Sequence, residues 1–314
     1  MQPAVTVALA ALLFFFNTIA GIAGDRDHDG LSDDFEQELL NRFVPTFMVA
    51  EGDCDGMPAE FLAGSPEPRP VARNGTIYGQ VFPVGGAGEF IEIHYYHLWA
   101  RDCGRRGHAL DVEHVSALIR TQPLQAMYWY ASAHQDTVCD ARNGARASQL
   151  QAEEHGPTVW ISRGKHASFL SYDLCMRGCG SDRCDPSTPL TPSNLINIGE
   201  PGAALNGAIW AESRRWALAP KMKTDFGAQT LSVLDDPGID GPTSLDRTRR
   251  PMRTVIAAGS SSVNAVASGN RRTTAAVSTA GTHTDRALDK GVAAAGKSLG
   301  RARRAVTGFL GLNR

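Results

Sequence analysis

The pattern of apolar positions predicts a chain built mostly from β-strands. Five runs rich in β-branched and aromatic residues are separated by turn or loop signals, at residues 75–84, 90–99, 110–119, 124–133 and 158–162. Before residue 200, helical spacing is found at 34–43, where apolar residues share one face, and a short helix is expected at 142–155. We therefore expect a mainly β fold: a two-layer β-sandwich with short helices and disulfide-stapled loops.

Composition divides the chain into four segments. Residues 1–23 have an apolar core followed by small residues, which is typical of a signal peptide, although an uncleaved membrane anchor is the alternative. We expect a calcium-loop and helix segment at 24–50 and the sandwich domain at 51–242. Residues 243–314 form a low-complexity basic tail.

Charge sets the tail apart from the body. Residues 243–314 hold 13 Lys and Arg against 3 Asp and Glu, whereas residues 1–242 hold 18 against 30. The tail is either a basic amphipathic helix that could contact an anionic membrane or envelope surface, or a disordered, solvated segment. The acidic body argues against a nucleic-acid partner.

Six cysteines follow the apolar leader: Cys54, Cys103, Cys139, Cys175, Cys179 and Cys184. An even number behind an export signal predicts three disulfides and a secreted or periplasmic, cell-envelope location. Cys103 and Cys139 both lie in Gly- and Asp-rich loops beside candidate site residues, which favours their pairing. The spacing of the last three cysteines could also be taken for zinc ligands.

An acidic loop directly after the leader has the spacing of a calcium loop. The proposed ligands are Asp25, Asp27, Asp29, the Leu31 carbonyl, Asp33 and Glu36, with Gly30 at the sharp turn. Because no helix can precede it, the loop resembles the lone EF-hand-like loops of dockerin and thrombospondin type-3 repeats. It predicts a structural Ca²⁺ site; the alternative is an acidic surface turn.

A second cluster of candidate ligands lies where a predicted strand begins: Asp102, His108, Asp111 and Glu113. Asp111 and Glu113 are two residues apart, so on a strand they project from the same face. One imidazole with three carboxylates suits Ca²⁺, Mg²⁺ or Mn²⁺ better than zinc. The alternative is a strand end with unrelated charges.

This cluster carries a family resemblance. Gly-His-Ala-Leu-Asp-Val-Glu at 107–113 resembles a heptad of the necrosis- and ethylene-inducing-peptide-like proteins, and Ser-Arg-Gly-Lys-His-Ala-Ser-Phe at 162–169 resembles a segment of the vacuolar-protein-sorting-associated sixty-two family. The resemblance implies secretion and a divalent cation held by the four residues of the second cluster. Leu110 and Val112 replace a His and a Trp of the first family's heptad.

Five other residues are candidates for a role in chemistry or in the core. His134, Lys165 and His166 could serve as catalytic groups, with an imidazole as acid or base and the lysine stabilising an anion. A loop packed by hydrogen bonds of His166 is the alternative. His94 and His97 lie within a predicted strand, on opposite faces, and we expect both to be hydrogen-bonded structural residues.

Three functions fit these features. The first is a secreted, cation-dependent protein that binds a lipid head group or a glycan at the second cluster. The second is a metal-dependent hydrolase that uses the same ion to activate water, and the third is a structural exported protein with calcium-stapled loops. A hydrolase would need His134 and His166 within hydrogen-bond reach of the acidic cluster.

Overall fold

The computed structural model describes residues 24–84, 88–104, 107–134, 141–178, 181–200, 203–205, 225–239 and 241–244. The predicted signal segment, the predicted tail beyond residue 244, and both Cys139 and Cys179 lie outside these ranges. Among the described residues, no helix is long and apolar enough to cross a bilayer.

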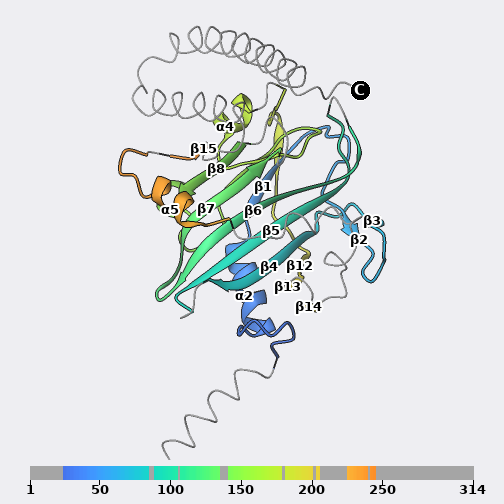
Figure 1. Ribbon diagram of the computed structural model, residues 1–314. Coiled ribbons are helices and arrows are strands. Elements are labelled where there is room, and N and C mark those ends of the chain that lie inside the picture. The colour runs from blue at the N-terminus through green and yellow to red at the C-terminus, as the bar shows by residue number, and fades with distance from the viewer. Residues whose placement is uncertain are drawn as a thin grey trace, which may run out of the picture.

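The larger of the two main sheets has seven strands in the order β12-β4-β5-β6-β7-β8-β15. In chain order they span Ile77–Val84 (β4), Phe90–Arg101 (β5), Ala109–Thr121 (β6), Leu124–Ala133 (β7), Ala141–Arg146 (β8), Leu195–Asn197 (β12) and Thr243–Ser244 (β15). β4 to β8 form an antiparallel meander, whereas β12 pairs with β4 in parallel (Figure 1).

The smaller sheet has the order β10-β9-β1-β11. Its strands are Thr46–Ala50 (β1), Thr158–Ile161 (β9), Ser168–Phe169 (β10) and Ser187–Leu190 (β11). β1 pairs in parallel with β9 and antiparallel with β11, so this sheet is mixed. Two-stranded pairs are formed by β2 (Glu60–Phe61) with β3 (Pro70–Ala72) and by β13 (Gly199–Glu200) with β14 (Ala203–Ala204).

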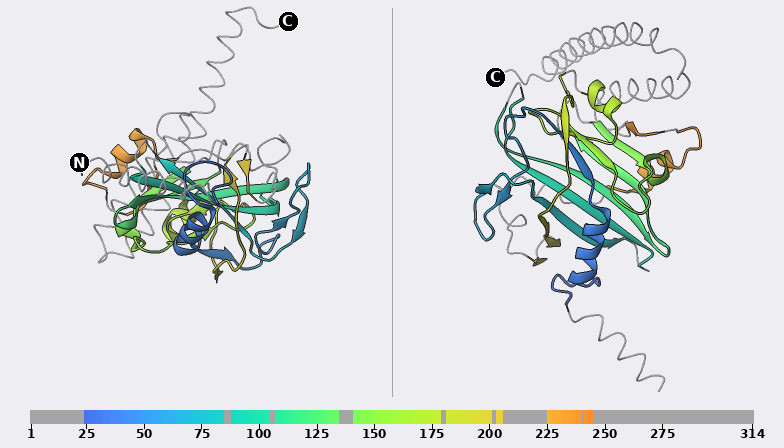
Figure 2. Two further views of the ribbon diagram at one scale, coloured as in Figure 1. Left: turned by 90° about the horizontal axis from the view of Figure 1, so that it is seen from below. Right: turned by 180° about the vertical axis from the view of Figure 1, so that it is seen from behind.

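The two main sheets pack face to face around one apolar core. Phe47 of β1 and Ile161 of β9 belong to the same buried cluster as Tyr95 of β5 and Trp129 of β7. The helix α2 (Asp33–Phe43) adds Leu39, Leu40 and Phe43 to this cluster. It lies so close to β4 that a Cβ at Gly79 would meet a Leu40 methyl at 2.4 Å. The predicted two-layer, mainly β fold is confirmed (Figures 1 and 2).

The outer face of the larger sheet is also covered. Phe61 and Ile198 pack over Tyr78 and Tyr96 near one end of the strands. At the other end, Phe226 and Leu234 of the segment that contains α5 (Ala228–Leu234) pack over Leu118 and Tyr130. Polar side chains of β5 and β6 lie between these two apolar clusters and are buried as a result.

The predicted helix at 142–155 is wrong in its first half. Ala141–Arg146 is strand β8, and only the single turn α3 (Ala147–Leu150) is helical. Pairing with β7 overrides the weak strand propensity of this stretch, because Asn143 and Ala145 face the core. Strand β1, the short pair β2–β3 and the helix α4 (Tyr172–Arg177) were not predicted.

Candidate metal and ligand sites

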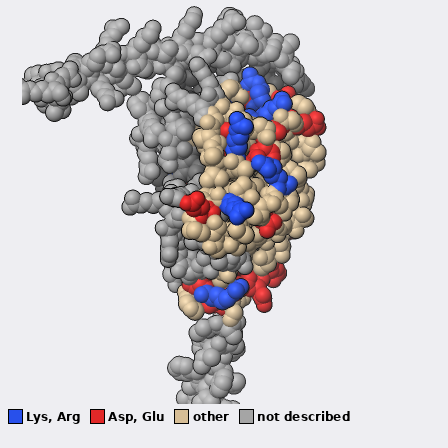
Figure 3. All heavy atoms as spheres, turned by 90° about the vertical axis from the view of Figure 1, so that its right-hand side faces the viewer, with Lys and Arg blue, Asp and Glu red and all other residues tan. Residues whose placement is uncertain are grey.

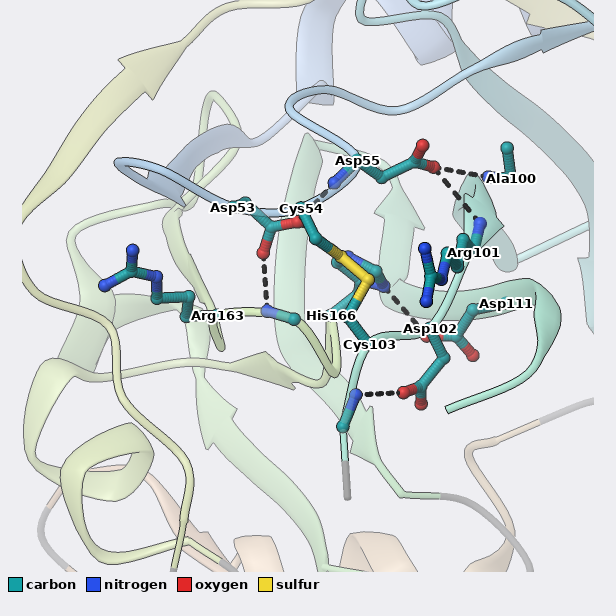
Figure 4. Close-up of a disulfide and its surroundings, with 12 residues drawn as sticks. Asp53, Cys54, Asp55, Ala100, Arg101, Asp102, Cys103, Asp111, Arg163 and His166 are labelled. Carbon is teal, nitrogen blue, oxygen red and sulfur yellow. Dashed lines mark hydrogen bonds and ion pairs between the residues drawn. A yellow bond between two sulfur atoms is a disulfide. The ribbon is translucent and has the colours of Figure 1, made fainter. Parts of the chain in front are cut away.

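Chemistry-bearing side chains gather at one end of the sandwich, where β5 ends and β6 begins. Three loops meet there: residues 51–59 after β1, 102–108 between β5 and β6, and 162–167 between β9 and β10 (Figure 4). Backbone hydrogen bonds join them, since the Cys103 N–H donates to the Gly164 carbonyl at 2.6 Å.

A disulfide between Cys54 and Cys103 locks two of these loops together. The predicted pairing of Cys103 with Cys139 is therefore wrong. The geometric reason is that loop 51–59 folds back onto the end of β5, where Asp55 accepts the backbone N–H groups of Ala100 and Arg101. A second disulfide joins Cys175 to Cys184, which excludes zinc ligation by this pair.

His166 lies at the centre of this end of the sandwich, fully buried between two carboxylates. Its Nδ1 is 3.0 Å from Asp111 Oδ2, and its Nε2 is 3.1 Å from Asp53 Oδ1. The ring stacks on Trp99 with centroids 3.9 Å apart. Burial alone would lower the pKa of His166, but the hydrogen bonds and charges of the two carboxylates raise it to about 9. The side chain is thus an imidazolium at neutral pH, and we call these three residues, Asp53, Asp111 and His166, the loop-end cluster.

Asp102 and His108 form a pair at the exposed rim of this region. Their backbones exchange two hydrogen bonds, of 2.9 and 3.1 Å, across a tight turn. Gly107 is needed in that turn, because a Cβ there would lie 2.5 Å from the Asp102 carbonyl oxygen. The turn brings His108 Nε2 to 3.7 Å from Asp102 Oδ2, and the His108 side chain is 58% exposed. We call these two residues the rim pair.

A second charged group lies next to the rim pair. Asp182 accepts hydrogen bonds from His134 at 2.9 Å and from Lys165 at 3.1 Å. Burial alone would lower the pKa of His134, but Asp182 and Glu113 together raise it. The stem of Lys165 passes the loop of the rim pair, since a Cβ at Gly104 would lie 3.1 Å from its Cγ.

The four predicted ligands of the second cluster therefore share a region but are not all in mutual contact. Asp111 is held by His166, Glu113 is buried beside His134, and the rim pair is at the surface. Among the described residues, the groups of three donors with ligand atoms within 4.8 Å of one another include none of these four. One such group combines Asp53 and His166 with Cys54, whose sulfur is in the disulfide.

The backbone is strained around the same region. Leu110, His134 and His166 all adopt positive φ angles, of 63°, 54° and 56°. Such conformations are uncommon for residues other than glycine and persist only where surrounding contacts enforce them, often at functional sites. The sequence signals none of these three conformations.

The N-terminal acidic loop, residues 25–36, is held in shape by hydrogen bonds from its backbone to its own carboxylates. The Gly30 N–H donates to Asp25 Oδ2 at 3.1 Å, and the Leu31 N–H donates to Asp29 Oδ1 at 2.7 Å. Gly30 has a φ of +98°, which only glycine adopts readily. Carboxylate oxygens of Asp25, Asp27 and Asp29 lie within 4.8 Å of one another, as do those of Asp27, Asp33 and Glu36.

Several oxygens of this loop are buried without a hydrogen-bond partner among the described residues: Asp25 Oδ1, Asp29 Oδ2 and Glu36 Oε1. Burial raises the pKa of Glu36 to about 8 and that of Asp29 to about 6. Orphaned carboxylate oxygens in an oxygen-only set are what a hard cation such as Ca²⁺ would satisfy. Asp33 differs from the other four carboxylates, because it is paired with Arg26.

The two strand histidines are buried and hydrogen-bonded, as expected. His97 Nε2 lies 2.7 Å from the Ser168 hydroxyl, and His94 Nε2 lies 2.9 Å from Glu92. His94 also faces His114 and Asp225, and these three residues form a further group of candidate metal donors within 4.8 Å of one another. This group was missed because Asp225 is distant in sequence and only the fold brings it to β5.

Charged side chains of both signs are interspersed over the face shown in Figure 3. No broad area of a single charge dominates that face within the described part of the chain. Local clusters, rather than a general surface field, therefore carry the candidate chemistry.

No protein-family model and no curated protein matches this sequence. A mutant of NLPPya aligns over 58% of this chain and 81% of its own, with a TM-score of 0.38 and 17% identity. NLPPya in complex with glucosamine aligns over 62% and 83%, with a TM-score of 0.34 and 17% identity. Necrosis and Ethylene inducing Protein 2 from the causal agent of cocoa's Witches Broom disease aligns over 51% and 72%, with a TM-score of 0.31 and 16% identity.

The structural similarity to necrosis- and ethylene-inducing-peptide-like proteins is limited to these low TM-scores and identities, so the relation to that family stays a prediction. The resemblance of the acidic loop to dockerin and thrombospondin type-3 loops stays a prediction, as does the resemblance of segment 162–169 to the sorting-associated family.

Proposed function

We propose that this chain is an exported protein that binds a divalent cation at Asp102, His108, Asp111 and Glu113, and that the cation binds a lipid head group or a glycan. The observation that carries the proposal is the geometry of the rim pair. Adjacent ligands of one cation, each at about 2.3–2.6 Å, lie roughly 3.2–3.7 Å apart. The 3.7 Å between His108 Nε2 and Asp102 Oδ2 is longer than a hydrogen bond and fits such a pair.

The tautomer of His108 also supports ligation. Its Nδ1 lies 2.9 Å from the Leu110 carbonyl, so this nitrogen carries the proton of the neutral ring. Nε2 then presents a lone pair toward Asp102. Since the ring is exposed, a bound cation would keep open positions for an outside ligand.

Carboxylates are concentrated at this end of the sandwich. Five gather here, from Asp53, Asp102, Asp111, Glu113 and Asp182. Among the described residues, Lys165, His134 and His166 supply cationic groups beside them, and Arg101 and Arg163 lie at the same end (Figure 4). The proposal therefore depends on the placement of individual oxygens and not on net charge, and the identity of Ca²⁺, Mg²⁺ or Mn²⁺ is to be measured.

The arrangement of the histidines favours binding over hydrolysis. A general base must be able to accept a proton at neutral pH. His166 is within reach of Asp111, but both its nitrogens donate to carboxylates and its pKa of about 9 keeps it protonated. His134 and Lys165 are engaged with Asp182, so the three catalytic candidates fit a positioning role better.

The N-terminal acidic loop supports a second, structural cation. Asn197 of β12 donates to Glu36 Oε2 at 2.8 Å, so a Ca²⁺ held by the other Glu36 oxygen would fix α2 against the sheet edge. Export through the predicted signal segment 1–23 agrees with the two disulfides, which form in oxidising compartments. The basic tail would add contact with an anionic surface.

Calcium, magnesium and manganese titrations of the mature full chain by calorimetry test this proposal. We expect two Ca²⁺ per chain, one of them lost in both Asp102→Asn and His108→Gln. The matched control is Asp34→Asn, which changes an exposed carboxylate of the acidic loop that is not among the proposed ligands, and it should keep both ions. Unchanged stoichiometry and affinity in both rim variants would overturn the assignment of the cation to this site.

A further inference from the structure

A polar group is buried on the outer face of the larger sheet, away from the sites above. His94 projects from β5 and His114 from β6, and Asp225 reaches them from the segment before α5. The side chains of His94, His114 and Asp225 are 0%, 1% and 2% exposed. Apolar clusters on either side, around Tyr96 and around Phe226, separate the group from water.

The three side chains converge on one point. His114 Nε2 lies 2.9 Å from Asp225 Oδ2, and His94 Nδ1 lies 3.9 Å from the same oxygen. Ligands at about 2.0–2.2 Å around a tetrahedral ion are roughly 3.3–3.5 Å apart. The two observed distances bracket this value, so small side-chain shifts would equalise them.

Glu92 orients the first of these ligands. Its Oε1 lies 2.9 Å from His94 Nε2 and accepts the Asp225 backbone N–H at 2.7 Å. Metal-bound histidines commonly donate one ring N–H to a carboxylate in this way and bind the ion through the other nitrogen. Glu92 Oε2 is buried without a hydrogen-bond partner among the described residues and could accept a further contact.

The charges of this group are compatible with a divalent ion. Two carboxylates, Glu92 and Asp225, are buried here with two imidazoles. Buried charges need compensation, which two protonated imidazoles or one divalent ion with neutral imidazoles would supply equally. Two nitrogens with carboxylate oxygens suit a borderline ion such as Zn²⁺ rather than Ca²⁺.

We propose that His94 Nδ1, His114 Nε2 and the Asp225 carboxylate form a buried site for Zn²⁺ or a similar transition-metal ion, with Glu92 as the positioning residue. Asp225 can supply both oxygens and so complete four donors. The ion ties the segment 225–234 to the sheet, where Phe226 and Leu234 already pack. This proposal is independent of the rim site.

Cobalt and zinc loading of the metal-free full chain tests the proposal. We expect one tightly bound Co²⁺ per chain with visible tetrahedral bands, displaced by Zn²⁺ and insensitive to excess Ca²⁺. His114→Gln and Asp225→Asn should weaken binding at least 100-fold. The matched controls, His155→Gln and Asp34→Asn, change exposed residues and should leave it unchanged.

A measurement on the unaltered protein covers the case in which those variants fail to fold. X-ray absorption at the zinc edge of the one-zinc chain should show two imidazole ligands with oxygen completing the shell. Two imidazoles in the zinc shell of the unaltered chain would support the site. No zinc uptake, no imidazole scattering, or full binding by folded Asp225→Asn would overturn it.

Discussion

The N-terminal acidic loop and the loop-end cluster differ in whether their buried carboxylates have a cationic partner within the chain. In the acidic loop, Asp29 and Glu36 each keep a buried oxygen that has no hydrogen-bond partner among the described residues. In the loop-end cluster, Asp53 and Asp111 each meet a nitrogen of His166 at 3.0–3.1 Å. The acidic loop has buried oxygens that an external cation would satisfy, whereas the loop-end cluster already contains the His166 imidazolium.

This difference determines how the stability of each region depends on ions in solution. Desolvating a carboxylate costs free energy that only a partner restores. A region that carries its own partner keeps its shape whatever the solution contains, so it can hold a recognition surface ready. A region that needs an external ion ties its stability to the supply of that ion.

Removing the internal cation should have the largest effect. His166→Ala leaves Asp53 and Asp111 buried without their shared imidazolium, and breaking a buried charge pair costs about 3–5 kcal/mol. We expect this loss in the free energy of unfolding, measured by urea denaturation. His155→Ala, an exposed histidine, is the matched control and should stay within about 0.5 kcal/mol. A loss below about 1 kcal/mol would contradict the role given to His166.

Removing the external cation should have the next largest effect. A ligand at 100 times its dissociation constant stabilises the folded state by about 2.7 kcal/mol. We expect chelation of Ca²⁺ to lower the stability by about this amount in the wild type and in His166→Ala, because the two regions share no residue. Asp29→Asn should lose the response to Ca²⁺, and a full response in this variant would place the ion elsewhere.

These two regions also differ in how far the sequence predicted them. The acidic loop is contiguous, so the spacing of Asp25, Asp27, Asp29 and Glu36 could be compared directly with a calcium loop. The strands β4 to β7 could be predicted from the sequence equally well, since their runs of β-branched and aromatic residues are local signals. The helix α2 was predicted to within one residue for the same reason.

The sequence identified only two of the three residues of the loop-end cluster. Asp111 and His166 were candidates, but Asp53 lies in a Gly- and Pro-rich stretch with no pattern of its own. Its role depends on the return of loop 51–59 to β5, fixed by Cys54–Cys103 and by Asp55. Such contacts between distant parts of the chain produce no local pattern in the sequence. The contacts of Asp225 with β5 and β6 could not be predicted for the same reason.

Without a bound metal ion, the acidic loop should make the folded chain less stable as the pH rises. The pKa of Glu36 is raised to about 8 in the folded chain from 4.5. Between these values the folded state binds more protons than the unfolded state, so stability should fall as pH rises from about 4.5 to 8. We expect a loss of about 1–2 kcal/mol, or roughly 2–8 °C in Tm, in thermal melts with a chelator. Glu36→Gln should flatten the curve; an equal slope in this variant would assign it to another group.

The smallest effect on stability should come from the rim pair. His108 is 58% exposed and its removal leaves no buried charge alone, so His108→Gln should change the free energy of unfolding by less than about 0.5 kcal/mol. The same change removes one proposed ligand, and we expect cation affinity at this site to fall at least tenfold, about 1.4 kcal/mol.

This separation of stability from affinity distinguishes the rim pair from Asp111, whose carboxylate also holds His166. Asp111→Asn should lower both quantities, because it removes a ligand and weakens a buried ion pair. Calorimetric titration and urea denaturation of His108→Gln and Asp111→Asn give both numbers for each variant. If His108→Gln were as destabilising as Asp111→Asn, the rim would be part of the structural cluster, and a cation held at an already formed surface would no longer be the best explanation of its geometry.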